Sequence, residues 1–335
     1  MDPVEALEEV AFLLERGRAS TYRVEAFRTA AEALAEVGPD AVRRLHTAGS
    51  LQDAPGIGKR TAQVVGEALS GTVPAYLAQL LADAGGPLVT GGEAVRAALR
   101  GDLHTHTDWS DGGSPLEVMV AAAQRVGHEY LAVTDHSPRL TVAHGLSADR
   151  LAEQLDVIAG LEVDGLRVLT GIEVDILDDG SLDQSPRLLQ VLDVVVASVH
   201  SKLRMDQTAM TRRMLGAVKD PATDVLGHCT GRLVEGGRGK RPQSTFDADR
   251  VFAACAEHDV AVEINARPER EDPPDELIAL ALEAGCLFSI DSDAHAPGQL
   301  DFLDHGCERA QRLGVPLDRI INTWPVDQLL DWTHS

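Results

Sequence analysis

The stretch Gly101-Asp-Leu-His-Thr-His-Thr-Asp-Trp-Ser-Asp-Gly112 decides the fold of this chain. It places His104 and His106 two residues apart at the end of a short apolar segment. Alternate side chains of a β-strand point to the same face, so both imidazoles can reach one metal ion. Asp111 follows in the loop. The stretch therefore predicts a strand that presents metal ligands at its carboxyl end.

Six further apolar segments follow, and segments with helical periodicity separate them. Together with the first, the predicted strands cover residues 101–104, 130–134, 168–174, 194–199, 225–227, 260–264 and 287–290. The main predicted helices cover residues 114–126, 148–160, 206–219, 248–258 and 275–284. Seven alternating β-α units predict an α/β domain with a parallel sheet. Polar groups at most of the strand ends favour a barrel, whose active site lies at that face.

Histidine or a carboxylate ends nearly every predicted strand. Six of the 12 histidines lie at these ends. One such histidine alone is more often an ordinary, hydrogen-bonded or solvated side chain, but that explanation is poor for the whole set. Neutral imidazole and carboxylate are ligands for Zn²⁺, Mn²⁺ and Fe²⁺. A tetrahedral ion needs only four ligands. The larger number of candidate ligands at these strand ends therefore indicates a cluster of two or three ions.

This pattern resembles the polymerase and histidinol phosphatase family, called PHP, over essentially all of residues 101–335. The resemblance implies a distorted (βα)7 barrel and three divalent ions, with Mn, Zn and Fe as the candidate metals. It implies a first ion at His104, His106, Glu173 and Asp293, which would be the catalytic residues. Glu173 would also bridge to a second ion at His200 and His228. Asp111, His136 and His295 would hold the third. All nine positions carry metal-capable side chains, so the resemblance implies an intact site.

Shorter motifs narrow the resemblance. Asp108-Trp-Ser-Asp-Gly, Gly227-His-Cys-Thr-Gly-Arg-Leu and Ile290-Asp-Ser-Asp-Ala-His are similar to the PHP domain that ends bacterial family X DNA polymerases. Residues 4–80 resemble the small helical domain that begins those polymerases. The polymerase palm is missing between the two regions, so we expect no nucleotide polymerisation. Two smaller departures, Cys229 in place of the family's usual proline and the variant stretch Arg267–Asp272, concern substrate contacts.

The chain is therefore expected to contain a helical domain at 1–84, a linker with a short helix at 85–100, and the PHP domain at 101–335. The linker assignment rests on four glycines and a proline within 85–100. The helical domain contains Pro55-Gly-Ile-Gly-Lys59, which resembles a helix-hairpin-helix motif. Such a motif directs backbone N–H groups at a DNA phosphate, and the candidate contacts are Gly56, Gly58, Lys59 and Arg60. The alternative is a tight turn that needs glycine only for its backbone conformation.

The expected chemistry is in-line attack on phosphorus by a metal-activated hydroxide. Basic residues that follow the strand ends could contact a substrate phosphate, and Lys202 and Arg232 are the preferred candidates. The others are Arg139, Arg204, Arg267 and Arg270, together with His144 near Gly145-Leu-Ser. For each of these side chains, a solvated or ion-paired state is the more common explanation.

Composition limits the class of protein. The formal net charge is -23, with 53 acidic and 30 basic residues, which argues against a broad DNA-binding surface. The apolar runs fall short of the ~20 residues of a membrane span, and the first residues lack the pattern of a secretion signal. Four scattered cysteines, with Cys255 and Cys286 expected to be buried, are typical of a reduced, cytoplasmic protein.

Three functions are consistent with the sequence. The first is a metal-dependent phosphoesterase of DNA ends, a 3′–5′ exonuclease or 3′-end-processing repair enzyme. The second is a small-molecule phosphatase of the histidinol-phosphate type, which the acidic charge favours. The third is a non-catalytic DNA-binding accessory of a repair polymerase encoded elsewhere, which the missing palm favours. In all three, no membrane partner is expected.

Overall fold

The computed structural model describes residues 1–84, 86–236 and 239–334. The chain forms two compact units, Met1–Leu88 and Val89–Ser335. Most of the segment expected to be a linker therefore belongs to the second unit, and Gly85 lies outside the described residues. Helix α6 (Glu93–Ala98) packs against α13 (Leu303–Arg312). At Gly92 a Cβ atom would lie 2.4 Å from the backbone nitrogen of Glu308, so glycine permits this close approach.

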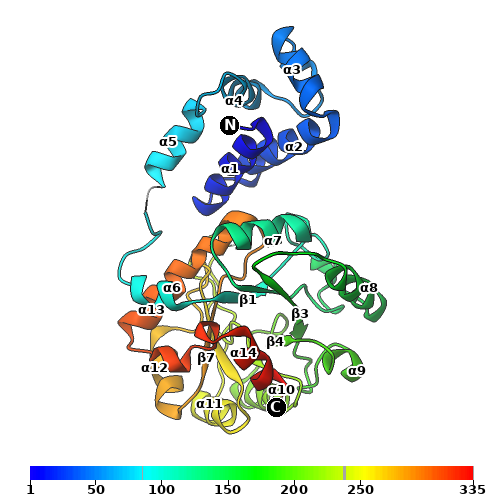
Figure 1. The fold of residues 1–335 in the computed structure, drawn as a ribbon. Helices are drawn as coiled ribbons and strands as arrows, with labels where there is room; N and C mark the ends of the chain where they lie inside the picture. Colours follow the sequence, from blue (N-terminus) through cyan, green and yellow to red (C-terminus); the bar gives the residue numbers. More distant parts are fainter. Residues whose placement is uncertain (85, 237–238, 335) are drawn as a thin grey trace. The chain divides into compact units, whose positions relative to one another are not determined.

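Seven parallel strands in sequential order form the sheet of the second unit (Figure 1). Their bounds are β1 Gly101–Thr105, β2 Tyr130–Val133, β3 Arg167–Asp175, β4 Val194–Ser198, β5 Val225–Leu226, β6 Ala261–Asn265 and β7 Phe288–Asp291. A bridge between Thr105 and Ala294 brings the first and last strands together, and the N–H of His106 donates to the carbonyl of Ala294 at 2.8 Å. The barrel is therefore nearly closed, which confirms the predicted (βα)7 architecture.

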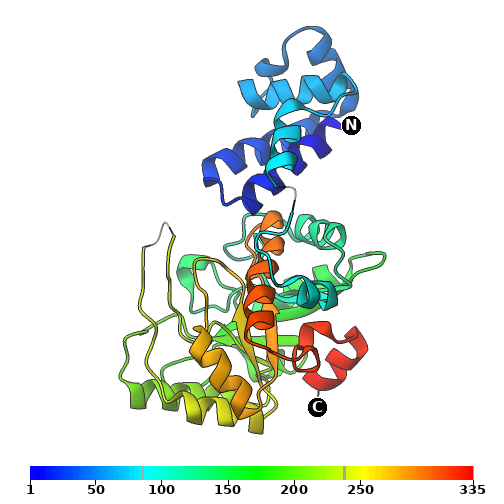
Figure 2. The ribbon, with the colours of Figure 1, turned by 90° about the vertical axis from the view of Figure 1, so that its left-hand side faces the viewer.

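Helices cover the outside of the barrel (Figure 2). The predicted ones are α7 (Leu116–Arg125), α8 (Ala148–Ala159), α10 (Gln207–Val218), α11 (Ala248–Glu257) and α12 (Asp275–Ala284). The sequence patterns did not predict α9 (Pro186–Leu189), α13 and α14 (Val326–Thr333). Ser147, Asp206 and Asp247 begin three of the predicted helices, and each side chain accepts a backbone N–H in the first turn.

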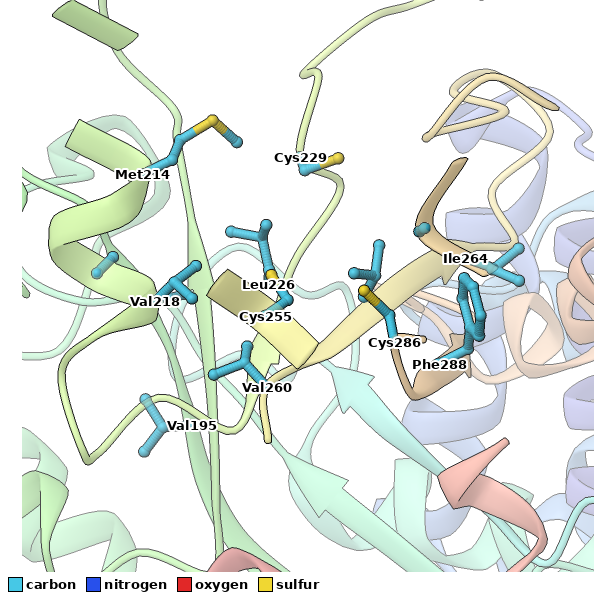
Figure 3. Packing of buried hydrophobic residues seen from close by; sticks show 14 of the residues in the cluster. Val195, Met214, Val218, Leu226, Cys229, Cys255, Val260, Ile264, Cys286 and Phe288 are labelled. Atoms are coloured by element: carbon cyan, nitrogen blue, oxygen red, sulfur yellow. The ribbon is translucent and has the colours of Figure 1, made fainter. Parts of the chain in front are cut away.

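Strands β4 and β6 are buried along their whole length, which explains their largely apolar sequences. Figure 3 shows how Val195 and Leu226 of the strands pack with Met214 and Val218 of α10. Cys229, Cys255 and Cys286 lie in the same cluster. All four cysteines of the chain are among the described residues and are buried and free, as expected for Cys255 and Cys286.

The described residues of the first unit form helices joined by turns and loops. Its elements are α1 (Pro3–Arg16), α2 (Thr21–Val37), α3 (Pro39–Thr47), the 3-10 turn η1 (Leu51–Asp53), α4 (Lys59–Leu69) and α5 (Ala75–Asp83). Leu7, Phe27 and Val64 are buried between the helices, and Arg28 makes two hydrogen bonds to the carboxylate of Glu15. Across the described residues of both units, no helix combines the length and the apolar character needed to cross a membrane.

Candidate metal centre

The carboxyl ends of the barrel strands bring all nine predicted ligands together. Four groups have ligand atoms within 4.8 Å of one another: His104, Glu173 and His228; His104, His106 and Asp293; His136, Glu173 and His200; and His106, Asp111, His136 and His295. The parallel barrel explains this convergence, because every strand ends at the same rim. Eight of the nine side chains are at most partly exposed, and Asp111 is the most accessible.

Glu173 of β3 lies at the middle of the cluster, and its two oxygens face different histidines. Oε1 is 3.1 Å from Nε2 of His200 and 2.8 Å from Nε2 of His228. Oε2 is 2.8 Å from Nδ1 of His136 and 3.4 Å from Nε2 of His104. A carboxylate can bind one ion through each oxygen, so this arrangement fits a bridging ligand.

Asp111 completes a second part of the cluster from the loop after β1. Its Oδ1 is 3.3 Å from Nε2 of His136 and 3.4 Å from Nε2 of His295. His106 joins the same group, since its ring centroid lies 4.2 Å from that of His295. The family resemblance assigns His106 to the first ion. In the structure, His106 belongs both to the group with His104 and Asp293 and to the group with Asp111, His136 and His295.

Buried nitrogen and oxygen atoms without a hydrogen-bond partner provide a test of whether these residues fit metal ions. Among the described residues, such atoms gather at this centre: Nε2 of His104, both ring nitrogens of His106 and His228, Nδ1 of His136, Nε2 of His200 and both carboxylate oxygens of Glu173. A buried polar group without a partner is costly. Divalent cations would satisfy these atoms, so this set of donor atoms fits a cluster of metal ions.

Two carboxylates outside the predicted set orient the histidines. Oε1 of Glu263 lies 2.6 Å from Nδ1 of His104, and Oε2 of the same carboxylate accepts the backbone N–H of His228. Asp175 is hydrogen-bonded to Nδ1 of His200. Carboxylates of this kind fix the tautomer of a ligating histidine and raise its basicity. Asp175 lies two residues after Glu173 on β3, and Glu263 lies two residues before Asn265 on β6. This same-face spacing was the available sequence signal.

Asp293 is held in a similar way. Its Oδ2 accepts hydrogen bonds from Nε of Arg270 at 3.0 Å and from Nδ2 of Asn265 at 3.1 Å. Its Oδ1 is 3.5 Å from Nε2 of His106. One carboxylate oxygen is therefore held by the protein, and the other is directed toward the cluster.

Asp135, immediately before His136, anchors the loop that carries Asp111. It accepts hydrogen bonds from the N–H and hydroxyl of Thr107 at 2.9 and 2.6 Å, from the hydroxyl of Ser110, and from Nε2 of Gln154 at 2.7 Å. Four donors converge on one fully buried carboxylate. The position of Asp111 therefore depends on Asp135, which the sequence analysis did not single out.

The charges of Glu173 and the histidines around it are strongly coupled. Burial, assisted by the positive charge of Arg270, lowers the pKa of His228 to about 4, so its imidazole is neutral near pH 7. Burial alone would raise the pKa of Glu173, but the surrounding histidines outweigh it and hold that pKa well below its usual range. Burial lowers the pKa of His104, His136 and His200, but the carboxylates that face them outweigh it and raise the pKa of all three. Of the four histidines nearest Glu173, only His228 therefore presents a neutral imidazole to the ionised carboxylate.

The predicted phosphate contacts lie in the loops after the strands, and most of them have protein partners. Lys202 pairs with Asp178, and Arg232 donates to the carbonyl of Arg270 at 3.1 Å and to Glu271 at 3.3 Å. Arg267 donates to the carbonyl of Asp293 at 2.9 Å. Arg270, as described, holds Asp293. The remaining candidates, Arg139, Arg204 and His144, lie in loops and are exposed.

In the first unit, the segment around Pro55 forms a turn that leads into α4. Gly56 has φ +79°, and a Cβ there would lie 3.1 Å from Cγ2 of Thr29. Gly58 begins α4, and its N–H donates to the hydroxyl of Thr61 at 2.9 Å. Lys59 is exposed, while the guanidinium of Arg60 lies 4.9 Å from the ring centre of Tyr76. The first N–H groups of α4 have no intrahelical acceptor, so they can bind an anion.

Comparisons with known proteins agree with this architecture. Residues 102–267 match the model of the PHP domain, and residues 1–72 match that of a helix-hairpin-helix domain. A DNA polymerase/3′-5′ exonuclease PolX from Bacillus subtilis is 35% identical over 226 residues, which are 67% of this chain and 39% of that protein. The chain thus spans well under half the length of this relative.

Other relatives are covered almost completely. A probable phosphatase from Vibrio parahaemolyticus is 28% identical over 66% of this chain and 88% of its own length. Among solved structures, the histidinol phosphate phosphatase of Lactococcus lactis, complexed with zinc, L-histidinol and phosphate, is 18% identical with a TM-score of 0.46, over 64% of this chain and 92% of that one. Residues 102–267 therefore form a PHP domain, and a helix-hairpin-helix domain precedes it in the chain.

Proposed function

We propose that this PHP-domain hydrolase is a phosphoesterase of DNA 3′ ends that depends on three divalent ions. The observation that carries the proposal is the bridging position of Glu173 among buried imidazole nitrogens that have no hydrogen-bond partner. The nine clustered residues would be the ligands, with His104, His106, Glu173 and Asp293 nearest the reaction. Mn, Zn and Fe all suit this donor set.

The protein's own side chains prepare the site for this chemistry. Divalent ions would supply Lewis acidity, which activates water and offsets the charge of phosphate oxygens. Glu263 and Asp175 hold His104 and His200 in one tautomer, and Arg270 holds one oxygen of Asp293. The arrangement fixes the ligands before a substrate arrives, so little reorganisation is needed during reaction.

DNA is the proposed substrate because of the first unit. The exposed Lys59 and the free N–H groups at the start of α4 suit a DNA phosphate, while Gly56 permits the preceding turn. Arg60 would contribute through its charge, although Tyr76 holds its guanidinium. The PolX relative, whose printed name includes a 3′-5′ exonuclease, supports the same substrate. We propose a cytoplasmic enzyme that processes DNA ends in repair, without polymerase activity of its own.

The test uses the full-length protein loaded with Mn²⁺ and a 5′-labelled oligonucleotide. We expect stepwise shortening from the 3′ end, which EDTA stops and which His104→Ala abolishes. A matched control is His258→Ala, which changes an exposed histidine at the end of α11. Intact single-stranded and gapped DNA after incubation with metal-loaded protein would contradict the proposal.

A small-molecule phosphatase is the second candidate. The relatives that are covered over 88–94% of their length are named probable phosphatases, which favours it. In that case, turnover of histidinol phosphate would exceed turnover of any phosphodiester. A non-catalytic accessory of a repair polymerase is the third candidate, and protein that purifies without metal and binds DNA would support it.

A further inference from the structure

Two basic loops lie side by side at one part of the metal-centre rim. The described part of residues 231–241 carries three basic side chains, Arg232, Lys240 and Arg241, and one acidic residue, Glu235, in a chain with a net charge of -23. Lys202 and Arg204 occupy the loop after β4. We call the set formed by Lys202, Arg204, Arg232, Lys240 and Arg241 the basic rim.

The segment 231–241 begins as a hairpin directly after the ligand His228. Leu233 and Arg241 exchange two backbone hydrogen bonds of 2.9 Å, and Nε of Arg241 donates to the carbonyl of Gly231 at 2.6 Å. The two legs of the hairpin are drawn in yellow-green in Figure 2. The base is fixed to the loop after β6, because Asp272 accepts the N–H groups of Thr230 and Arg232.

The same hairpin contacts the loop after β4. The hydroxyl of Ser244 donates to the carbonyl of Leu203 at 2.8 Å, and a Cβ on Gly231 would lie 2.7 Å from Cδ2 of Leu203. Leu203 separates Lys202 from Arg204 in the sequence, so this contact brings the basic residues of the two loops to the same part of the rim. Lys202, Arg204 and Lys240 are exposed. The pairing of Lys202 with Asp178 is a surface ion pair, which binds weakly and can yield to a phosphate.

The opposite side of the barrel has the reverse charge. The strand order places β1 across the ring from β4 and β5. Its loop and the start of α7, residues 106–117, contain Asp108, Asp111 and Glu117 and no lysine or arginine. These three side chains are exposed. A polyanion that reaches the centre therefore meets exposed lysine and arginine side chains at the loops after β4 and β5 and none at the loop after β1.

We propose that a DNA chain approaches the metal centre over the basic rim and ends there, because the acidic β1 side repels its continuation. The inference rests on the proposed function and specifies how that site receives its substrate. The charge distribution would explain why hydrolysis is confined to DNA ends. The phosphodiester backbone has favourable partners on only one side of the scissile bond. An overall acidic protein needs such a local basic surface to hold a polyanion.

The test compares the wild-type protein with the double variant Arg204→Glu, Lys240→Glu, both loaded with Mn²⁺. The control is Lys219→Glu, which reverses an exposed charge at the end of α10, at the opposite end of the barrel. The substrates are a linear oligonucleotide, a circular single-stranded DNA of the same composition, and bis-p-nitrophenyl phosphate, which has one phosphate and no attached nucleotide chain.

For the double variant, we expect the ratio of kcat/KM on the linear oligonucleotide to that on bis-p-nitrophenyl phosphate to fall about tenfold or more. The slope of log affinity against log salt should decrease by about 2, and Lys219→Glu should change neither. Wild-type protein should leave the circle intact. An unchanged ratio and salt slope, or cleavage of the circle at the linear rate, would overturn this inference alone. Hydrolysis of bis-p-nitrophenyl phosphate without any DNA cleavage would overturn the proposed function with it.

Discussion

Replacing Asp135 by alanine is expected to detach the loop after β1 from the metal centre. The carboxylate accepts four hydrogen bonds, and three of them come from Thr107 and Ser110 of that loop. The loop continues to Asp111, which lies 3.3 and 3.4 Å from the nearest nitrogens of His136 and His295. Loss of Asp135 therefore removes the restraint on one ligand without altering any ligand.

The magnitude follows from the donors that lose their acceptor. The two hydroxyls can turn elsewhere, but the N–H of Thr107 and the amide of Gln154 remain buried. Each unsatisfied donor costs about 1–3 kcal/mol. Burial raises the pKa of Asp135, which shows that burying this carboxylate carries a cost of its own, and alanine recovers that part. The expected net loss of stability for Asp135→Ala is about 2–4 kcal/mol.

Asparagine at the same position is the matched variant. When the asparagine amide faces Gln154, the side-chain amide of Gln154 can flip so that its oxygen accepts. The hydroxyl of Thr107 can likewise accept a hydrogen bond instead of donating one. The remaining oxygen still accepts the N–H of Thr107, so we expect a cost below about 1 kcal/mol. Metal content per protein, measured by mass spectrometry after Mn²⁺ loading and desalting, should fall by one ion for Asp135→Ala and stay unchanged for Asp135→Asn.

Denaturant unfolding and bis-p-nitrophenyl phosphate hydrolysis complete the comparison of the two variants. Wild-type metal content and activity in Asp135→Ala would refute the anchoring role. Equal losses in both variants would refute the hydrogen-bond argument, because the two side chains differ in their capacity to satisfy the same donors.

Four further predictions concern the metal centre and the DNA contact. Glu173→Gln should lower kcat on bis-p-nitrophenyl phosphate by at least about a hundredfold, because losing a bridging ligand costs more than losing a supporting partner; a smaller loss would argue against bridging. Glu263→Ala should weaken metal binding about 10–100-fold in a chelator competition, whereas the exposed Glu257→Ala should not; equal affinities would exclude the orienting role. Removing metal with EDTA should abolish activity and lower Tm in calorimetry, with both restored by Mn²⁺, and an unchanged Tm would show that the ions do not stabilise the fold. Lys59→Glu should reduce DNA affinity at low salt and lower the salt slope by about 1, compared with Lys219→Glu; identical slopes would place the DNA contact elsewhere.

Much of the barrel could be predicted from the sequence because local patterns encode it. Strands buried on both faces must be apolar throughout, so each appears as a short run, and the helices between them show their own period. The two C-terminal helices α13 and α14 escaped prediction because they lie beyond the last strand, where no alternating β-α pattern marks them. The placement of residues 89–100 also depended on contacts with distant α13, which no local pattern reveals.

The sequence by itself determined the ligand types and their approximate place, because side chains at the ends of parallel strands must converge on one rim. Only the tertiary structure decided how they are grouped and supported. The two oxygens of Glu173 face separate sets of histidines, and Glu263, Asp175 and Asp135 act through contacts across strands. Such contacts join residues up to 159 positions apart. The charge difference across the rim likewise depends on which loops become neighbours in the closed barrel, since net charge along the chain carries no information about direction in space.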